Sequence, residues 1–176
     1  MIFKEQTIPG VFLIEPESFT DERGILRRHF CQKEYARHGL NTSVAQANIS
    51  ENHHRHTLRG FHTYGDDKTL SCIKGTIYDI VVDIRPDSPG YLKWVAFVIN
   101  SESRNSLYVP TGCANAFLTL EDDTWIHYYH STFYDPGREC CIRYNDPLFG
   151  FTWPVEPAIV SPKDRNHHNY IPIKPL

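Results

Sequence analysis

The sequence predicts an all-β protein, a double-sheet jelly-roll β-sandwich with few short helices. Short apolar segments rich in β-branched and aromatic residues recur along the 176-residue chain, turn-forming residues separate them, and helical periodicity is rare. A jelly roll is favoured because packing two sheets together manages their exposed edges. The length fits one domain and no repeat or linker interrupts it, so we expect a single domain over residues 1–176.

Most of the chain is expected in short strands joined by turns. The one convincing helix runs from Gln32 to Gly39, where acceptable helix formers precede a glycine that ends it. Turns are indicated at Thr20-Asp-Glu-Arg-Gly24, at Gly75 and in the loop Arg85-Pro-Asp-Ser-Pro-Gly90. Strands are expected at about 11–15, 25–30, 44–50, 58–64, 70–74, 76–84, 92–99, 106–109, 116–120, 124–131 and 139–144, followed by an irregular proline-rich tail from Asp146.

Composition and charge exclude several classes of function. A formal net charge of −3 and a pI near 6.3 argue against general binding of nucleic acids. The five cysteines form no C-x-x-C pair, which indicates neither a disulfide framework nor a zinc ribbon, and a reducing cytosol is the simplest inference. The chain shows no signal peptide and no run of roughly 20 apolar residues. We therefore expect a cytoplasmic protein without nucleic-acid or membrane partners.

The stretch Thr57-Leu-Arg-Gly-Phe-His-Thr-Tyr64 combines strand character with two chemically useful side chains. Arg59 offers a planar fork for phosphate or carboxylate, and His62 offers a base. Strict alternation would place Arg59 and His62 on opposite faces of the strand. The two can share a site only if the strand bends or ends there, or if a second subunit contributes.

Metal and nucleophile chemistry find little support in the sequence. His54-Arg-His56 has the H-x-H spacing of metal-binding jelly rolls, but no glutamate follows, and the loop composition places these histidines in solvent. No G-x-S-x-G elbow occurs, the cysteines lie in apolar contexts, and no glycine-rich phosphate loop precedes a helix. Neither a metal nor another cofactor is expected.

Acid–base chemistry inside the sandwich remains. His62 is a candidate base, and Tyr128 and Tyr129 on an expected strand are candidate acids. Lys68 can stabilise negative charge, and Asp164 in the tail can orient an imidazole. Each residue also has an ordinary structural interpretation, since a strand tyrosine usually packs and a single lysine is usually solvated.

Eight short motifs follow one another between about Ile8 and Asp164. They are Phe19-Thr-Asp-Glu-Arg-Gly24, Gln46-Ala-Asn-Ile-Ser50, Leu58-Arg-Gly-Phe-His62, Gly75-Thr-Ile-Tyr-Asp-Ile-Val-Val-Asp-Ile-Arg85 with Ser88-Pro89, Val109-Pro-Thr-Gly112, Tyr134-Asp-Pro136, Trp153-Pro154 and Ser161-Pro-Lys-Asp164. Each is weak evidence alone. In this order they resemble the dTDP-4-dehydrorhamnose 3,5-epimerase family of nucleotide-sugar epimerases.

The resemblance implies a metal-free, cupin-like homodimer that acts on a nucleoside-diphosphate-4-keto-6-deoxy sugar in deoxysugar or polysaccharide biosynthesis. It implies that His62 removes the proton beside the C4 ketone, that Asp164 orients His62, and that Tyr128 returns a proton from the opposite face. Lys68 would neutralise the enolate oxygen, as removal of such a proton requires. The positions matching substrate contacts are Arg23, Gln46, Asn48, Arg59, Glu139 and Lys163, with Phe19 and Tyr134 as aromatic residues near the nucleotide base.

Two residues depart from the family pattern at substrate-contact positions. Arg28 stands where the family commonly has glutamate, and Asn115 stands where it commonly has histidine. Because these changes alter charge and hydrogen bonding, a different nucleotide or sugar is expected, such as a GDP-linked heptose or a CDP-linked dideoxy sugar, or inversion at only one carbon. A 3,4-ketoisomerase and a non-catalytic sugar-nucleotide-binding protein remain the alternatives.

Overall fold

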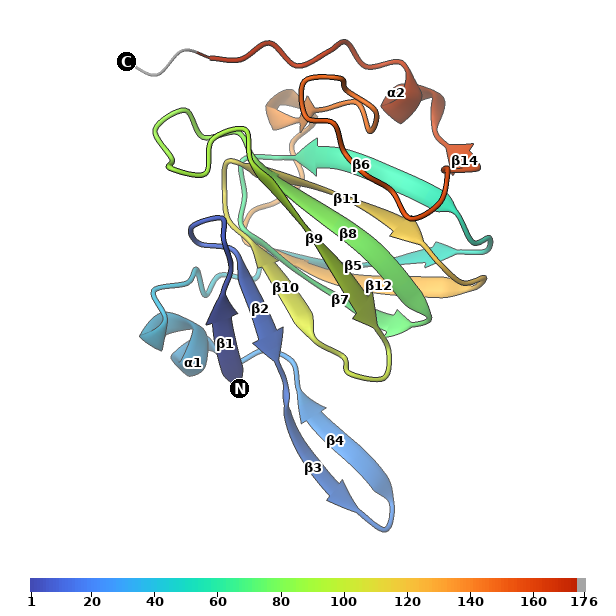
Figure 1. Ribbon diagram of the computed structural model, residues 1–176. Coiled ribbons are helices and arrows are strands. Elements are labelled where there is room, and N and C mark those ends of the chain that lie inside the picture. The colour runs from blue at the N-terminus through green and yellow to red at the C-terminus, as the bar shows by residue number, and fades with distance from the viewer. Residues whose placement is uncertain (174–176) are drawn as a thin grey trace.

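Two six-stranded sheets pack face to face in the computed structural model, which describes residues 1–173 (Figure 1). The sheets have the orders β1-β2-β10-β7-β12-β5 and β13-β6-β11-β8-β9, with β14 pairing in parallel with β6. The predicted all-β double-sheet fold is confirmed. The first sheet contains β1 (Ile2–Glu5), β2 (Phe12–Glu15), β5 (Gln46–Asn52), β7 (Lys68–Lys74), β10 (Ser106–Val109) and β12 (Thr124–His130). The second contains β6 (Thr57–Thr63), β8 (Thr76–Asp83), β9 (Trp94–Asn100), β11 (Cys113–Thr119), β13 (Cys140–Cys141) and β14 (Ile159–Val160).

The interior between the sheets changes from apolar to polar along the central strands. Inward positions of β7 alternate as Lys68, Leu70 and Cys72, and β12 places Tyr128 opposite Leu70 and His130 opposite Lys68. Apolar side chains from both sheets fill one end and form the main core. The polar ends of the same strands leave room for a pocket. One alternating pattern therefore builds both the core and the site.

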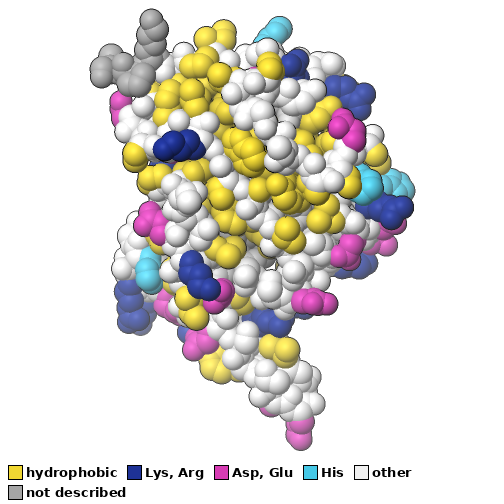
Figure 2. Space-filling model, in the orientation of Figure 1, with side chains coloured by type: hydrophobic (Ala, Val, Ile, Leu, Met, Phe, Trp, Pro, Cys, Tyr) yellow, Lys and Arg dark blue, Asp and Glu magenta, His cyan; other side chains and the backbone are white. Residues whose placement is uncertain are grey.

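The hairpin of β3 (Glu17–Asp21) and β4 (Gly24–Arg28) forms a separate two-stranded sheet that projects from the body (Figure 1). Its side chains Phe19, Ile25 and Leu26 are half or more exposed. Figure 2 shows hydrophobic side chains on this arm and charged ones at its tip. The predicted turn at residues 20–24 lies at the tip of this hairpin. The strands expected on either side of the turn were 11–15 and 25–30, so β3, which directly precedes the turn, was not predicted.

The other differences from the expected elements involve short or edge segments. The expected helix is confirmed as α1 (Gln32–Arg37), whereas the strand expected at 139–144 shortens to β13 after the 3₁₀ turn η1 (Pro136–Arg138). β1 was not expected, and the tail is not wholly irregular because it contains β14 and α2 (Pro162–Arg165). β1 is stabilised by antiparallel pairing with the nearby β2, whereas β14 depends on parallel pairing with the distant β6, which no local pattern encodes. Within residues 1–173, no helix has the length and apolar character needed to span a membrane.

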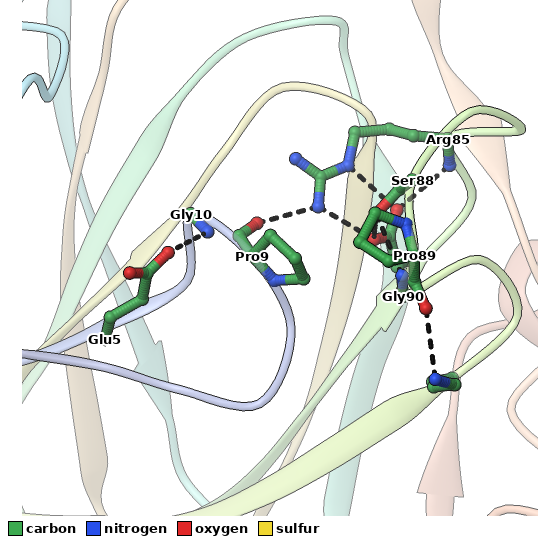
Figure 3. Close-up of polar contacts among 9 residues, drawn as sticks. Glu5, Pro9, Gly10, Arg85, Ser88, Pro89 and Gly90 are labelled. Atoms are coloured by element: carbon green, nitrogen blue, oxygen red, sulfur yellow. Dashed lines mark hydrogen bonds and ion pairs between the residues drawn. The ribbon is translucent and has the colours of Figure 1, made fainter.

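The loop after β8 is held by a buried carboxylate (Figure 3). Asp83 accepts hydrogen bonds from the Arg85 guanidinium at 2.7 and 2.8 Å and from the Ser88 hydroxyl at 2.5 Å. Arg85 also donates to the Pro9 carbonyl at 2.8 Å, which ties the loop to the N-terminal segment. A Cβ atom on Gly112 would lie 2.4 Å from Arg85 Cγ, so the turn at 110–112 requires glycine. This cluster closes the end of the sandwich away from the hairpin (Figure 1).

Candidate active site

A pocket of about 910 Å³ opens between the two sheets. Strands β5, β7 and β12 line it from the first sheet, β6 and β11 line it from the second, and the segment 159–164 closes one side. The volume lies within the range of small-molecule sites, roughly 300–1,000 Å³. The sequence-predicted residues that line it are His62, Lys68, Tyr128, Asp164, Gln46, Asn48, Arg59, Asn115, Tyr134 and Lys163.

A histidine and a carboxylate form the closest ionisable pair in this pocket. His62 Nε2 lies 2.6 Å from Asp164 Oδ1. Asp164 is buried in α2, where its backbone N–H donates to the Ser161 hydroxyl that caps the helix. Burial raises the pKa of Asp164, but hydrogen bonding and charge interaction with His62 outweigh it and lower the pKa overall. The pair fixes the ring orientation and leaves the other ring nitrogen to exchange a proton.

A bulge in β6 brings Arg59 and His62 into one pocket. His62 pairs with Asn115 and Arg59 pairs with Phe117, so three steps along β6 match two along β11. The extra residue reverses the alternation between the two side chains. Gly60 makes the bulge possible, because it has a φ of +121° and its Cβ would lie 2.6 Å from both Ala116 Cα and the Asn115 carbonyl oxygen. Of the alternatives left open by the sequence, a bend or end of the strand or a second subunit, the structure shows an irregularity within the strand itself.

Lys68 supplies a buried cation at the floor of the pocket. Burial lowers the pKa of its ammonium, against the opposing charges of Asp66 and Asp79. Its Nζ donates to the His62 carbonyl oxygen at 3.5 Å, and within residues 1–173 no carboxylate oxygen comes within 4.0 Å of it. A buried cation without a direct ion pair is suited to stabilise a developing oxyanion.

A second buried carboxyl lies behind Lys68. Asp79 on β8 is fully buried, and Asn115 Nδ2 donates to its Oδ2 at 2.8 Å. Burial raises the pKa of Asp79 to about 8, although Asn115 and Lys68 act in the opposite direction. Asn115, expected from the resemblance to depart from the family pattern, therefore lines the pocket and also binds a buried acid. Asp79 was not among the site residues predicted from the sequence, although its alternation with the buried Ile77 and Val81 indicates that it faces inward.

Tyr128 faces the pocket from the opposite sheet to His62. Burial raises the pKa of its phenol, so the group keeps its proton throughout the neutral range. Tyr129 points to the other face of β12 and packs against Phe30 and His127, so it is not an alternative acid for this pocket. His130, which the sequence did not indicate as a site residue, shares the face of Tyr128, and its Nδ1 lies 2.7 Å from Asp66 Oδ2.

The remaining predicted contacts divide into two groups. Gln46 accepts a hydrogen bond from the Tyr134 backbone N–H at 2.8 Å, and Glu139 lies beside the pocket, paired with Lys163. Three other predicted contacts lie on the projecting hairpin, away from this pocket of the same chain: Phe19, Arg23 and Arg28. Arg28 pairs there with Glu17 at 2.7 Å and Glu34 at 3.1 Å. Arg23 is 85% exposed and pairs with Asp21.

Comparison with known proteins identifies the family. The family model of dTDP-4-dehydrorhamnose 3,5-epimerase matches residues 5–171. The chain belongs to the dTDP-4-dehydrorhamnose 3,5-epimerase family. A member from Methanothermobacter thermautotrophicus is 34% identical over 170 residues, covering 93% of this chain and 91% of that protein.

Solved structures of the family have the same fold. The enzyme from Elizabethkingia anophelis matches with a TM-score of 0.91 and 29% identity over 97% of this chain and 96% of that one. ChmJ, a 3′-monoepimerase from Streptomyces bikiniensis solved with dTDP-quinovose, matches with a TM-score of 0.87 and 32% identity over 93% and 85%. Family membership confirms the predicted enzyme class, a nucleotide-sugar epimerase with a cupin-like fold.

Proposed function

We propose that this epimerase inverts C3, C5 or both in a nucleoside-diphosphate-4-keto-6-deoxy sugar. The observation that carries the proposal is the placement of a carboxylate-bound imidazole and a buried phenol on opposite sheets of one pocket. Inversion requires a base on one face of the sugar and an acid on the other. His62 takes the proton beside the ketone, and Tyr128 returns a proton from the other side.

The developing enolate receives its stabilisation from Lys68. Its ammonium is already dehydrated and held beside the His62 backbone, so little reorganisation is needed when negative charge appears on the ketone oxygen. Asp164 acts as a positioning residue for His62. Arg59 at the pocket wall supplies a planar cation suited to the diphosphate.

We further propose that the substrate differs from that of the 3,5-epimerases, or that only one carbon is inverted. Asn115 offers an amide where the family commonly has an imidazole, and this amide is bound to the buried Asp79. When a hydrogen-bonding side chain that contacts the substrate is replaced, the enzyme's preference among sugars changes, because a substrate group can lose its partner. The 3′-monoepimerase ChmJ, at 32% identity, supports a one-carbon reaction within this fold.

A panel of dTDP-, GDP- and CDP-linked 4-keto-6-deoxy sugars in heavy water tests these proposals. NMR and mass spectrometry locate each incorporated deuterium. Uptake at C3 or C5 with a change of configuration supports an epimerase and shows which carbons react. A product carbonyl at C3 would instead establish a ketoisomerase, and binding without uptake across the panel would favour a binding protein.

The working unit proposed for this enzyme is a homodimer in which the β3–β4 hairpin reaches the pocket of a second copy. The hairpin exposes Phe19, Ile25 and Leu26, and β5 at the edge of the first sheet is paired on one side only among the described strands. Exposed apolar surface on a projecting arm favours exchange between two copies. Arg23 and Phe19 would then contact substrate across the interface.

Mixing two inactive variants tests this arrangement. Arg23→Ala and His62→Asn homodimers should each be inactive, while a mixed dimer regains one working site if Arg23 acts across the interface. Light scattering should give a dimer mass at micromolar concentration. A monomeric mass, or no recovery on mixing when mixed dimers are shown by mass spectrometry, would contradict the proposal.

A further inference from the structure

Three side chains of the kinds that bind metals lie together beside the pocket. The proposed mechanism uses only His62 among them as a catalytic group and gives the three no joint role. His62, Glu139 and Cys141 each offer one ligand atom, and the three atoms lie within 4.8 Å of one another. Strand pairing creates this arrangement, because Cys141 on β13 lies directly opposite His62 on β6. Glu139 precedes β13 by one residue. Among residues 1–173, no other group of three such side chains is as close.

Glu139 supplies an independent indication of a ligand. Its side chain is nine-tenths buried, and one carboxylate oxygen, Oε2, binds the Lys163 ammonium. The other oxygen, Oε1, is buried without a hydrogen-bond partner. A buried carboxylate oxygen without a partner is costly and usually has a function to explain it.

We propose that His62, Glu139 and Cys141 bind one divalent cation such as Zn²⁺. The bound ion inhibits the epimerase because it coordinates the ring nitrogen of His62 that would otherwise take the substrate proton. A thiolate and a carboxylate together balance the charge of the ion, and a sulfur–nitrogen–oxygen set suits zinc rather than magnesium or calcium. Metal–ligand bonds of about 2.0–2.3 Å place tetrahedral ligands roughly 3.5 Å apart, so side-chain rotations that close the cluster by about 1 Å are sufficient.

The neighbours of His62 fit this role. Asp164 holds Nε2, which leaves the other ring nitrogen for the ion, and a carboxylate on the far side of a ligating imidazole is the usual arrangement in metal sites. Binding replaces the thiol proton of Cys141 with the metal and releases that proton to solvent, with no change of oxidation state. Three protein ligands leave a fourth position for water.

Inhibition rests on the proposed role of His62 as the base, whereas metal binding does not. The two can therefore be tested separately. Cys140 provides the matched control, because it is the adjacent thiol and is exposed rather than placed in the cluster. The probe is Co²⁺, which reports thiolate ligation by a charge-transfer absorption band, followed by displacement with Zn²⁺.

The full chain without a polyhistidine tag should bind one equivalent of Co²⁺ with a thiolate charge-transfer band. Cys140→Ser should keep the band and Cys141→Ser should lose it. His62→Asn, which retains the thiol, should weaken binding at least tenfold. Absence of the band in the parent, or its persistence in Cys141→Ser, would overturn the site.

Zinc inhibition provides the second readout. Zn²⁺ should abolish deuterium exchange in the parent and in Cys140→Ser, and a chelator should restore it. Cys141→Ser should retain exchange and require at least tenfold more Zn²⁺ for inhibition. Equal zinc sensitivity of the parent and Cys141→Ser would overturn the inhibitory role. If no sugar nucleotide exchanges at all, the cobalt spectra still decide whether the metal binds.

Discussion

Replacement of Gly60 by alanine should damage both the fold and the alignment of Arg59 with His62. At Gly60 a methyl group would lie 2.6 Å from Ala116 Cα and from the Asn115 carbonyl oxygen, and both atoms belong to the backbone of the paired strand. The strained φ of +121° costs about 1–3 kcal/mol for a residue with a side chain. Overpacking against the neighbouring strand adds about 1–3 kcal/mol.

The expected loss is therefore about 2–6 kcal/mol, a large part of the 5–15 kcal/mol that stabilises a typical domain. Gly24→Ala is a control with nearly the same backbone, because Gly24 has a φ of +128° and no atom within 4 Å of the added Cβ. It should lose only the cost of strain. Urea unfolding of both variants at one protein concentration gives the two free energies.

Gly60→Ala should also slow deuterium exchange by about 10²-fold at a temperature where it remains folded, since displacement of a catalytic group by about 1 Å has an effect of this size. Gly24→Ala should exchange deuterium at the rate of the parent protein, provided that the β3–β4 hairpin keeps its structure. Equal losses of unfolding free energy in the two variants would refute the claim that contact across β6 and β11 requires glycine.

Three further substitutions separate the proposed roles in the pocket. Tyr128→Phe should still take up deuterium through His62 but invert the carbon about 10²–10⁴-fold more slowly, as NMR of the recovered sugar would reveal; equal loss of both would contradict separate base and acid roles. Lys68→Met should lower kcat about 10²–10³-fold in steady-state assays, and an unchanged kcat would remove it from enolate stabilisation. Asp164→Asn should unfold more easily than the parent above pH 3.8, because the carboxyl pKa is lowered in the folded state. That difference should shrink as the pH falls below 3.8 through the folded-state pKa, and a constant difference between pH 7 and pH 3 in urea unfolding would count against the His62–Asp164 interaction.

Local patterns predicted the strands whose side chains alternate between core and solvent. β10 was predicted with its exact bounds, and most central strands within two or three residues. The hairpin strand β3 was missed because it is exposed along its length and carries no buried face for a pattern to mark. β14 was missed because only its parallel pairing with β6, about a hundred residues earlier, makes it a strand.

The candidate site was predictable for a different reason. The motifs that contain His62 and Asp164 resemble one family, and that resemblance also implied roles for Lys68 and Tyr128. The structure brings these four residues to one pocket. The contact between His62 and Asp164 spans 102 residues, and no spacing rule within the chain implies it. The cluster of Glu139 and Cys141 beside His62 was also invisible in the sequence, because it depends on the pairing of β13 with β6.

The most direct test of the central claim measures deuterium uptake by His62→Asn and the parent during one turnover of an active 4-keto sugar nucleotide. If His62 is the base, the variant should lose uptake at the reacting carbon by about 10²–10⁴-fold while it still binds the nucleotide sugar. Uptake by the variant at the parent rate would contradict the assignment of the base and, with it, the proposed mechanism.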